Sequence, residues 1–431
     1  MIPLASRTRL TLVSLGALGA ASVAFGAGYE KAQTWSAKSS AEAGAVVGST
    51  AGAEALYFNP AGLARASRRG EISVNFSPTL SQFSGRNSYA PASVGTVSGS
   101  TTLSPVLSVL AAYRPTPKLG LGVGYYVSGG SRAKFENLDY STLDADFDTV
   151  HPTAEADLSI KELAVGAGYE LARGFRVGLS WRMVKVGGKF STVRYTGTAL
   201  AQIDLDNIDA TRLNAWKLGA QYEEPAHRWG LGFALRTSVA FTATADGSGH
   251  FETADGSNPG SSSTSLGTGA VEIENTFPLQ VSLGGWTRAT ELLRLFWQYD
   301  FTNYAKDRTL GVHGTVGATP LTDIAQDWKN MHVFRLGGEY TRFFFPVRMG
   351  YAYTSAVTST DAARSTFSSP GPGHSLTVGS GFILNGNIDV DGALEYSFAS
   401  GTGRNAAESL TTDSEFKSHA YAAHFSARYR F

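Results

Sequence analysis

The sequence predicts an all-β fold: a fourteen-stranded antiparallel transmembrane β-barrel with a small N-terminal plug inside the lumen. Three observations predict this class. After Glu71 the chain alternates apolar and polar residues almost to its end, and the connections between the alternating segments are short and long in turn. Before Glu71, by contrast, a stretch without alternation contains an apolar triplet followed by Asn-Pro.

The composition fits a membrane barrel better than a soluble domain. Charged residues make up 17% of the 431 residues, below the roughly 25% of soluble domains, while 49 residues are Gly and 11% are aromatic. Basic and acidic residues balance at 36 each, so nucleic acid is not an expected partner. The mean hydropathy of −0.09 excludes a bundle of membrane helices. The absence of cysteine excludes disulfides, thiol nucleophiles and cysteine-bound metals.

Residues 1–26 are typical of a secretory signal peptide. Two arginines precede an apolar run from Leu10 to Phe25, and the small residues Ala24 and Gly26 predict cleavage before Ala27. The alternative is a single membrane anchor, but the run is shorter than the roughly 20 residues that a membrane span needs.

The alternating part of the chain divides into fourteen segments, which together form the expected barrel domain, residues 71–431. Between Phe175 and Met183, for example, odd positions are apolar and even positions are Arg, Gly or Ser, which is the period of a strand. The expected strands cover residues 71–85, 102–114, 119–130, 156–171, 175–190, 212–222, 229–243, 271–286, 291–302, 328–340, 344–356, 374–384, 388–399 and 415–431.

The connections between these strands predict which end of the barrel faces which side. Tight turns such as 172–174 and 385–387 alternate with loops of roughly 15–28 residues that are rich in Ser, Thr, Gly and Asp. Such loops are unusual in a compact soluble domain, but outer-membrane barrels keep short turns in the periplasm and long loops outside. An even number of strands then places both termini on the periplasmic side.

The last strand indicates how the protein reaches its membrane. Odd positions from Tyr421 to Phe431 are apolar, and Phe431 ends the chain. This pattern resembles the assembly signal of Gram-negative barrels, so outer-membrane lipids and the barrel-assembly machinery are expected partners. The alternative is the last strand of a soluble sandwich.

The stretch EALYFNPAGLARA, residues 54–66, interrupts the strand pattern. Pro60 disfavours the helical region for Asn59, so Asn59 is expected to cap a short helix whose first residue is Pro60. A fourteen-stranded lumen is too wide to be filled by wall side chains alone. We therefore expect residues 27–70 to form a plug inside the barrel. The alternative is a disordered periplasmic tail, but such a tail would expose the apolar triplet of this segment.

Several stretches resemble the outer-membrane long-chain fatty acid transport proteins of the FadL/TodX type: Tyr57-Phe58-Asn59-Pro60-Ala61-Gly62-Leu63, 275–278 with 284–286, and 334–340 with 347–353. The resemblance implies a fourteen-stranded barrel plugged by an N-terminal domain that contains the Asn-Pro-Ala segment. It also implies that hydrophobic ligands enter from outside, bind apolar pockets and leave sideways through the wall into the bilayer. Only Asn59, Pro60 and Ala61 carry over as a plug or gating motif, because the ligand-binding loops are the least alike.

The third expected strand is rich in glycine, with Gly120, Gly122, Gly124, Gly129 and Gly130. Glycine in a strand marks kinks and bulges, so we expect the lateral opening at Gly129 and Gly130. A lateral exit avoids moving an alkyl chain into water, which costs about 0.8 kcal/mol per CH₂. The alternative is that these glycines only thin the lumen side of the wall.

Catalytic and metal sites are not indicated. Residues 139–148 (DYSTLDADFD) could bind Ca²⁺ or only solvate a loop, and they lack the spacing of an EF-hand. Arg176 or Arg182 could pair with a ligand carboxylate. We expect no cofactor and no enzymatic activity.

The leading hypothesis is passive transport of hydrophobic molecules across the outer membrane, with long-chain fatty acids as the expected ligands. One alternative is the uptake of aromatic or alkane hydrocarbons. Alternatives from other classes are a general porin, an adhesin or an outer-membrane lipid hydrolase.

Overall fold

The computed structural model describes residues 36–66, 70–85, 97–141, 143–195, 199–257, 260–306, 308–363, 370–404 and 413–431. The expected signal peptide and the first residues of the expected plug lie outside this set. No helix among the described residues is long and apolar enough to cross a membrane.

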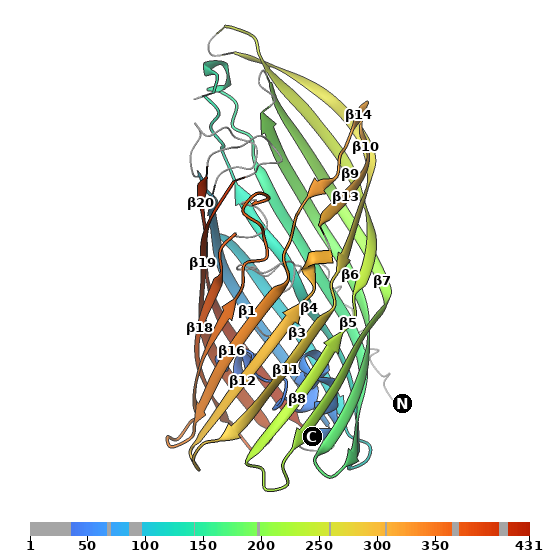
Figure 1. Ribbon diagram of the computed structural model, residues 1–431, viewed down its shortest axis with the longest axis vertical. Helices are drawn as coiled ribbons and strands as arrows, with labels where there is room; N and C mark the ends of the chain where they lie inside the picture. Colours follow the sequence, from blue (N-terminus) through green and yellow to red (C-terminus); the bar gives the residue numbers. More distant parts are fainter. Residues whose placement is uncertain are drawn as a thin grey trace, which may run out of the picture.

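Fourteen strands form the wall, each antiparallel to the next. They are, in order around the wall, β1 (Gly70–Gly85), β3 (Thr102–Tyr113), β4 (Leu119–Phe135), β5 (Ala154–Ala172), β6 (Phe175–Tyr195), β7 (Ala199–Glu223), β8 (Trp229–Arg236), β11 (Gln280–Arg288), β12 (Leu293–Thr302), β16 (Met331–Tyr340), β17 (Val347–Thr354), β18 (Gly373–Ile383), β19 (Ile388–Gly403) and β20 (Ser414–Arg430). Because β20 pairs with β1, the sheet closes on itself (Figure 1). The structure confirms the predicted fourteen-stranded barrel.

Further strands extend the wall above this ring. They are β9 (Val239–Ala254), β10 (Ser261–Phe277), β13 (Thr309–Val316) and the short β2 (Val97–Ser98), β14 (Thr319–Pro320) and β15 (Ile324–Ala325). Two expected strands, 229–243 and 271–286, are each broken in two, at residues 237–238 and 278–279. At the second break Pro278 has no N–H to give to a ladder.

The prediction for β7 was wrong at its start. The strand begins at Ala199 and not at residue 212. Residues 199–211 are acidic and weakly alternating, which indicates a loop, but they pair with both β6 and β9. Pairing on two sides satisfies the backbone and overrides the weak local preference.

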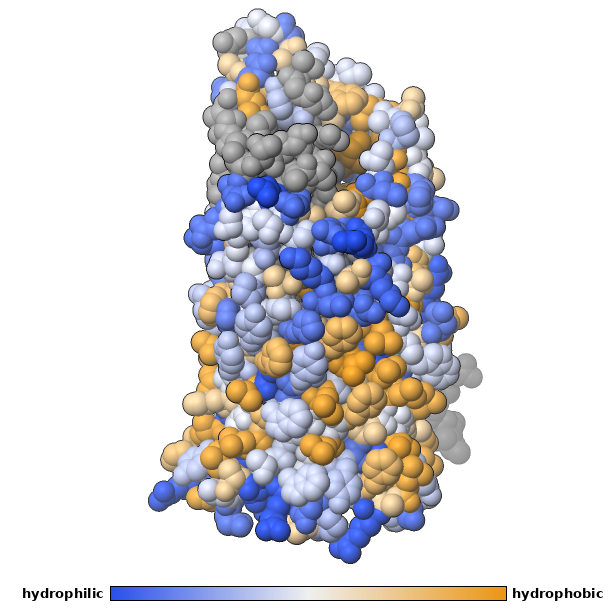
Figure 2. All heavy atoms as spheres, viewed as in Figure 1, coloured by the Kyte–Doolittle hydropathy of each residue, from blue (hydrophilic) through white to orange (hydrophobic). Residues whose placement is uncertain are grey.

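The two faces of the wall follow the alternation. On β1, Ile72, Val74 and Phe76 are exposed on the outside, whereas Ser73 and Asn75 are buried on the lumen side. Figure 2 shows the hydrophobic residues of one side gathered over the lower half of the barrel, between hydrophilic residues at the lower rim and above. Lipid offers no hydrogen bonds, and the closed ladder satisfies the backbone without them.

The N-terminal segment consists of short helices instead of strands. These are α1 (Ala37–Ala41), η1 (Gly52–Glu54), α2 (Ala55–Phe58) and η2 (Pro60–Arg65), and two more 3₁₀ turns, η4 (Ala145–Phe147) and η5 (Tyr304–Lys306), lie in later connections. The coils of the N-terminal segment lie within the lower half of the barrel in Figure 1. They contact lumen-facing residues of strands around the whole wall, from β4 through β18 to β20.

Candidate functional site

Asn59 begins η2 as expected for a cap. Its backbone is extended, with φ −158°, and its side-chain oxygen accepts a hydrogen bond from the N–H of Ala61 at 3.2 Å. Pro60 is the first residue of the turn, where its missing N–H leaves no donor unsatisfied. The helix is of the 3₁₀ type.

The amide nitrogen of Asn59 joins this cap to the wall. It donates to the carbonyl oxygen of Val47 at 2.8 Å and lies 3.0 Å from the carbonyl oxygen of Ala220 in β7 and 3.2 Å from that of Phe233 in β8. Asn59 is fully buried. One side chain therefore holds two turns of the N-terminal segment against two wall strands.

Glycines on the lumen side let the segment approach the wall backbone. A Cβ at Gly178 of β6 would lie 2.2 Å from the carbonyl carbon of Pro60, and one at Gly120 of β4 would lie 2.0 Å from the carbonyl oxygen of Leu63. A Cβ at Gly219 of β7 would lie 2.0 Å from Oδ1 of Asn59. Gly120 thus thins the lumen side of the wall, where Leu63 lies against it.

The wall is interrupted between β3 and β4. Their ladder runs from Tyr113 opposite Leu121 to Ser108 opposite Tyr126 and ends there. Above this point β3 continues to pair with β1, and β4 continues to pair with β5. The two strands meet again where Arg132 Nη1 donates to the carbonyl oxygen of Leu103 at 2.7 Å.

Gly129 and Gly130 lie beside this gap. A bulge between Val127 and Gly129 shifts the register of β4 against β5, and Gly130 has a φ of 145°, which L side chains rarely adopt. Gly129 lies opposite Ile160 of β5. These two glycines therefore differ from Gly120, which faces the N-terminal segment.

Tyr57 of α2 stands at the inner side of the gap. It packs against Val106 of β3 and Val127 of β4, and its ring centre lies 5.1 Å from that of Tyr126. The ammonium of Lys217 lies 5.1 Å from the same ring centre. In the sequence, Tyr57 stands out only as part of the apolar triplet and of the family resemblance, and its place at the gap was not predictable because its neighbours come from strands that are distant in the chain.

A buried polar layer lies above the N-terminal segment. Glu162 of β5 accepts from Tyr126 Oη at 3.0 Å and from Arg182 Nη1 at 2.9 Å, and it also binds Arg236. Arg182 is 1% exposed, and its charge is held by this carboxylate. Arg176, the other predicted partner of a ligand, is paired with Glu223 at 3.3 Å.

An apolar cavity lies above the polar layer. It has a volume of about 50 Å³ and is lined by residues of β5, β6, β7, β9, β10, β13 and β15. The lining includes Ile160, Phe190, Phe241 and Phe277, and Asn275 is the one polar residue among the described residues that line it. Successive lumen positions of β5 thus pass from Gly166, beside Leu56, through Glu162 to Ile160 at the cavity.

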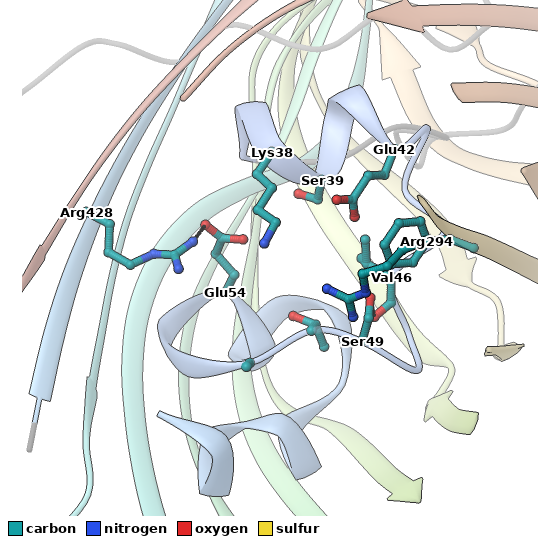
Figure 3. A pocket seen from close by; sticks show the side chains of 11 residues that line it. Lys38, Ser39, Glu42, Val46, Ser49, Glu54, Arg294 and Arg428 are labelled. Carbon is teal, nitrogen blue, oxygen red and sulfur yellow. Dashed lines mark hydrogen bonds and ion pairs between the residues drawn. The ribbon is translucent and has the colours of Figure 1, made fainter. Parts of the chain in front are cut away.

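A second, polar cavity of about 90 Å³ lies within the N-terminal segment. In Figure 3, Lys38 of α1 and Glu42, the residue after α1, point toward the same space as Arg294 from β12, and Glu54 is paired with Arg428 at 2.6 Å. Burial raises the pKa of Glu42 from its usual 4.5 to about 7.

The acidic loop uses its carboxylates to hold backbone. Asp139 accepts from the N–H of Ser141 at 2.8 Å, and Asp146 accepts from the N–H of Gly256 at 2.6 Å. No group of three potential metal ligands occurs among the described residues.

Comparisons with known proteins agree with this architecture. The sequence profile of one family, described as outer membrane protein transport protein (OMPP1/FadL/TodX), matches residues 17–431. A comparison with curated proteins found no match.

Solved structures share the fold at low sequence identity. A Pseudomonas aeruginosa FadL homologue is 14% identical, with 94% of this chain and 100% of that chain covered and a TM-score of 0.75. The toluene transporter TodX of Pseudomonas putida is 14% identical, with 93% and 99% covered and a TM-score of 0.76. The toluene transporter TbuX of Ralstonia pickettii is 16% identical, with 93% and 99% covered and a TM-score of 0.67.

Proposed function

Because the chain belongs to the outer membrane protein transport protein family (OMPP1/FadL/TodX), we propose that it carries long-chain fatty acids into the cell. The protein is a β-barrel of the Gram-negative outer membrane, and its family transports hydrophobic molecules. The family consists of transporters and not of enzymes.

The observation that supports this proposal is the position of the apolar cavity relative to the gap in the wall. Ile160 lines the cavity and lies opposite Gly129, which borders the gap between β3 and β4. A ligand in the cavity therefore has a short route into the bilayer, without passage through the buried charges around Glu162. Such a lateral exit avoids a hydration cost of about 0.8 kcal/mol for each CH₂.

In this proposal the N-terminal segment is the plug. Asn59 holds it against β7 and β8, Pro60 and Ala61 lie against Gly168 of β5 and Gly178 of β6, and Tyr57 covers the inner side of the gap. Displacement of Tyr57 opens the route from the cavity to the lipid. The plug also keeps polar solutes out, which opposes a general porin.

Aromatic or alkane hydrocarbons are the second candidate cargo. No charged residue is among the described residues that line the cavity, so nothing there recognises a carboxylate. Toluene transport is stated for TodX and TbuX, which share the fold.

Uptake of labelled oleate and labelled toluene tests the proposal, in cells that lack their own transporter of this type and express this protein. Oleate uptake that is lost on deletion of residues 54–63 supports a plugged fatty acid channel. Toluene uptake alone moves the assignment to hydrocarbons, and uptake of neither overturns the proposal.

The exit is tested by filling the gap. Gly129→Leu is expected to slow uptake several-fold, whereas Gly392→Leu, an outward-facing position of β19 with no neighbouring atom closer than 4.0 Å to a new Cβ, is the control. Equal uptake by the two variants would exclude an exit at Gly129.

A further inference from the structure

The wall has a second interruption, on the other side of the cavity. The β9–β10 hairpin extends the paired strands β8 and β11. It is hinged on them, because β8 breaks from β9 and β10 breaks from β11 at the same level of the wall. The last pair below the hinge is Arg236 with Gln280, and the first pair above it is Val239 with Phe277.

This hinge opens a seam between β7 and β9. The β7–β8 ladder ends at Lys217 opposite Arg236, and the β7–β9 ladder begins at Asp209 opposite Thr244. Between these pairs β7 advances by eight residues (217 − 209), and so does the chain from β8 to β9 (244 − 236). The register is therefore kept, and β7 has only separated from its neighbour. Within the described stretch 199–257, residues 210–216 therefore face 237–243 without a ladder. A backbone–backbone hydrogen bond ties the lower end, where Thr237 N donates to the carbonyl oxygen of Trp216 at 3.0 Å.

Two residues near the seam border both the cavity and the outer surface. Phe241 and Asn275 line the apolar cavity on the inside and also line a groove on the outside. The groove is lined further by the cationic side chains of Arg212, Lys306 and Arg308. In Figure 2, hydrophilic residues gather directly above the hydrophobic band, in the region where Figure 1 places β13.

Arg212 occupies the seam itself. It lies opposite the lumen-facing, buried Val184 of β6, and its Nε donates to the carbonyl oxygen of Ala240 in β9 at 3.1 Å. The guanidinium thus supplies a bond to a carbonyl that the ladder leaves open. A side chain can swing away from this position, whereas a continuous backbone ladder could not open.

The seam lies at the boundary between lipid and water. Leu213 at its middle and Trp216 at its lower end are 58% and 41% exposed, on the apolar outer surface. Aromatic side chains of this kind are typical of the interface region of outer-membrane barrels. The anionic neighbours in the groove are engaged, since Glu274 faces His313 at 3.7 Å and Asp323 accepts from the N–H of Val312 at 3.0 Å.

We propose that the seam between β7 and β9 is a side entrance for single-chain carboxylate amphiphiles from the outer leaflet. Arg212 binds the carboxylate, and the alkyl chain passes Phe241 into the apolar cavity, which itself offers no cation. The inference rests on the proposed transport of fatty acids and adds the place and the residue that recognise the head group.

A disulfide across the seam tests the entrance, because the native chain has no cysteine. Leu213→Cys with Ala240→Cys closes the seam on oxidation. Leu218→Cys with Leu235→Cys is the matched control, since these residues are already paired in the β7–β8 ladder. Oxidation is expected to reduce oleate uptake by the seam pair about tenfold, reversibly with reductant, and to leave the control unchanged. Uptake that oxidation of the seam pair does not change overturns the entrance.

Arg212→Gln is a second, independent test that needs no oxidation. Loss of a charge-assisted bond predicts a half-saturation concentration for oleate about tenfold higher, with toluene uptake unchanged and Arg212→Lys partly restoring the wild-type value. An unchanged half-saturation concentration overturns the role of Arg212. If the wild-type protein takes up no oleate, the proposed function fails; if it does and both tests show no effect, only the side entrance fails.

Discussion

The Nδ2 atom of Asn59 lies 2.8 Å from the carbonyl oxygen of Val47, and the Oδ1 atom of the same side chain caps η2 through Ala61. Asn59→Ala removes both interactions and leaves the carbonyl oxygens of β7 and β8 without this donor. Loss of a cap and of buried hydrogen bonds is expected to weaken docking of residues 36–66 by about 1–3 kcal/mol. Hydrogen exchange measures this weakening, and peptides from this segment should exchange faster in the variant than in the wild type. Asn385→Ala, in the exposed β18–β19 turn, serves as the control, and equal exchange in both variants would contradict the prediction.

The contact between Gly178 and Pro60 leaves no room for a side chain. Gly178→Ala places a Cβ 2.2 Å from the backbone of Pro60, so the N-terminal segment must shift or detach. Overpacking of this kind is expected to cost about 1–3 kcal/mol. Limited proteolysis of the folded barrel measures it as faster cleavage within residues 36–66. In Gly392→Ala the new Cβ has no atom closer than 4.0 Å, so cleavage at the wild-type rate is expected there.

Glu42 makes docking of α1 sensitive to pH. Its pKa is raised by burial from 4.5 to about 7, against the opposing charges of Lys38 and Arg348. Between these two values the docked segment holds a proton that the undocked segment releases, so docking is strongest at low pH and weakens as the pH rises toward 7. Relative to the intrinsic, base-catalysed exchange rate at each pH, hydrogen exchange around α1 should therefore speed up from pH 5 to about pH 7 in the wild type, by roughly tenfold for each unit at most.

Glu42→Gln provides the control for this pH dependence. The amide stays neutral at every pH, so the variant should show little change in docking across the same range. A wild-type pH profile that matches that of Glu42→Gln would exclude Glu42 as the titrating group.

The carboxylate of Glu162 forms ion pairs with two buried arginines. Glu162→Gln leaves Arg182 and Arg236 with a neutral partner, and uncompensated buried charge is expected to cost about 3–5 kcal/mol. The measurement is the unfolding temperature of the detergent-solubilised barrel, which should fall. The matched substitution Glu274→Gln affects an exposed residue and is expected to change it little. A similar unfolding temperature for both variants would show that the pairs are dispensable.

Phe431 joins the end of the chain to its first strand. Its N–H donates to the carbonyl oxygen of Gly70 at 3.0 Å, and Gly70 leaves room for its ring. As the predicted recognition residue for the assembly machinery, Phe431 should be needed in the cell more than in detergent. Phe431→Ala is expected to reduce folded protein in the outer membrane several-fold while refolding in detergent is retained. Equal losses in both settings would assign Phe431 a purely structural role.

Alternation along single strands was enough to predict much of the fold. The side chains from Phe175 to Met183 alternate because one face of the strand meets lipid and the other meets the lumen. Each strand must meet this requirement by itself, so the pattern is visible in each strand's own sequence. The local chemistry of Asn59 and Pro60 likewise predicted a cap, because both effects act within a few residues. The start of β7 at Ala199 was missed, since its strand character depends on partners in β6 and β9.

The sequence by itself therefore determined the barrel, its number of strands and the capped helical turn at Asn59 and Pro60. Only the tertiary structure decided where the wall is interrupted and where an apolar cavity forms. The gap beside Gly129 and the seam beside Arg212 are relations between two strands, and Ile160 and Phe241 become neighbours of one cavity only when β5 and β9 enclose the same lumen. Periodicity records which way a side chain points, but it does not record how far apart two neighbouring strands lie or what stands across the lumen.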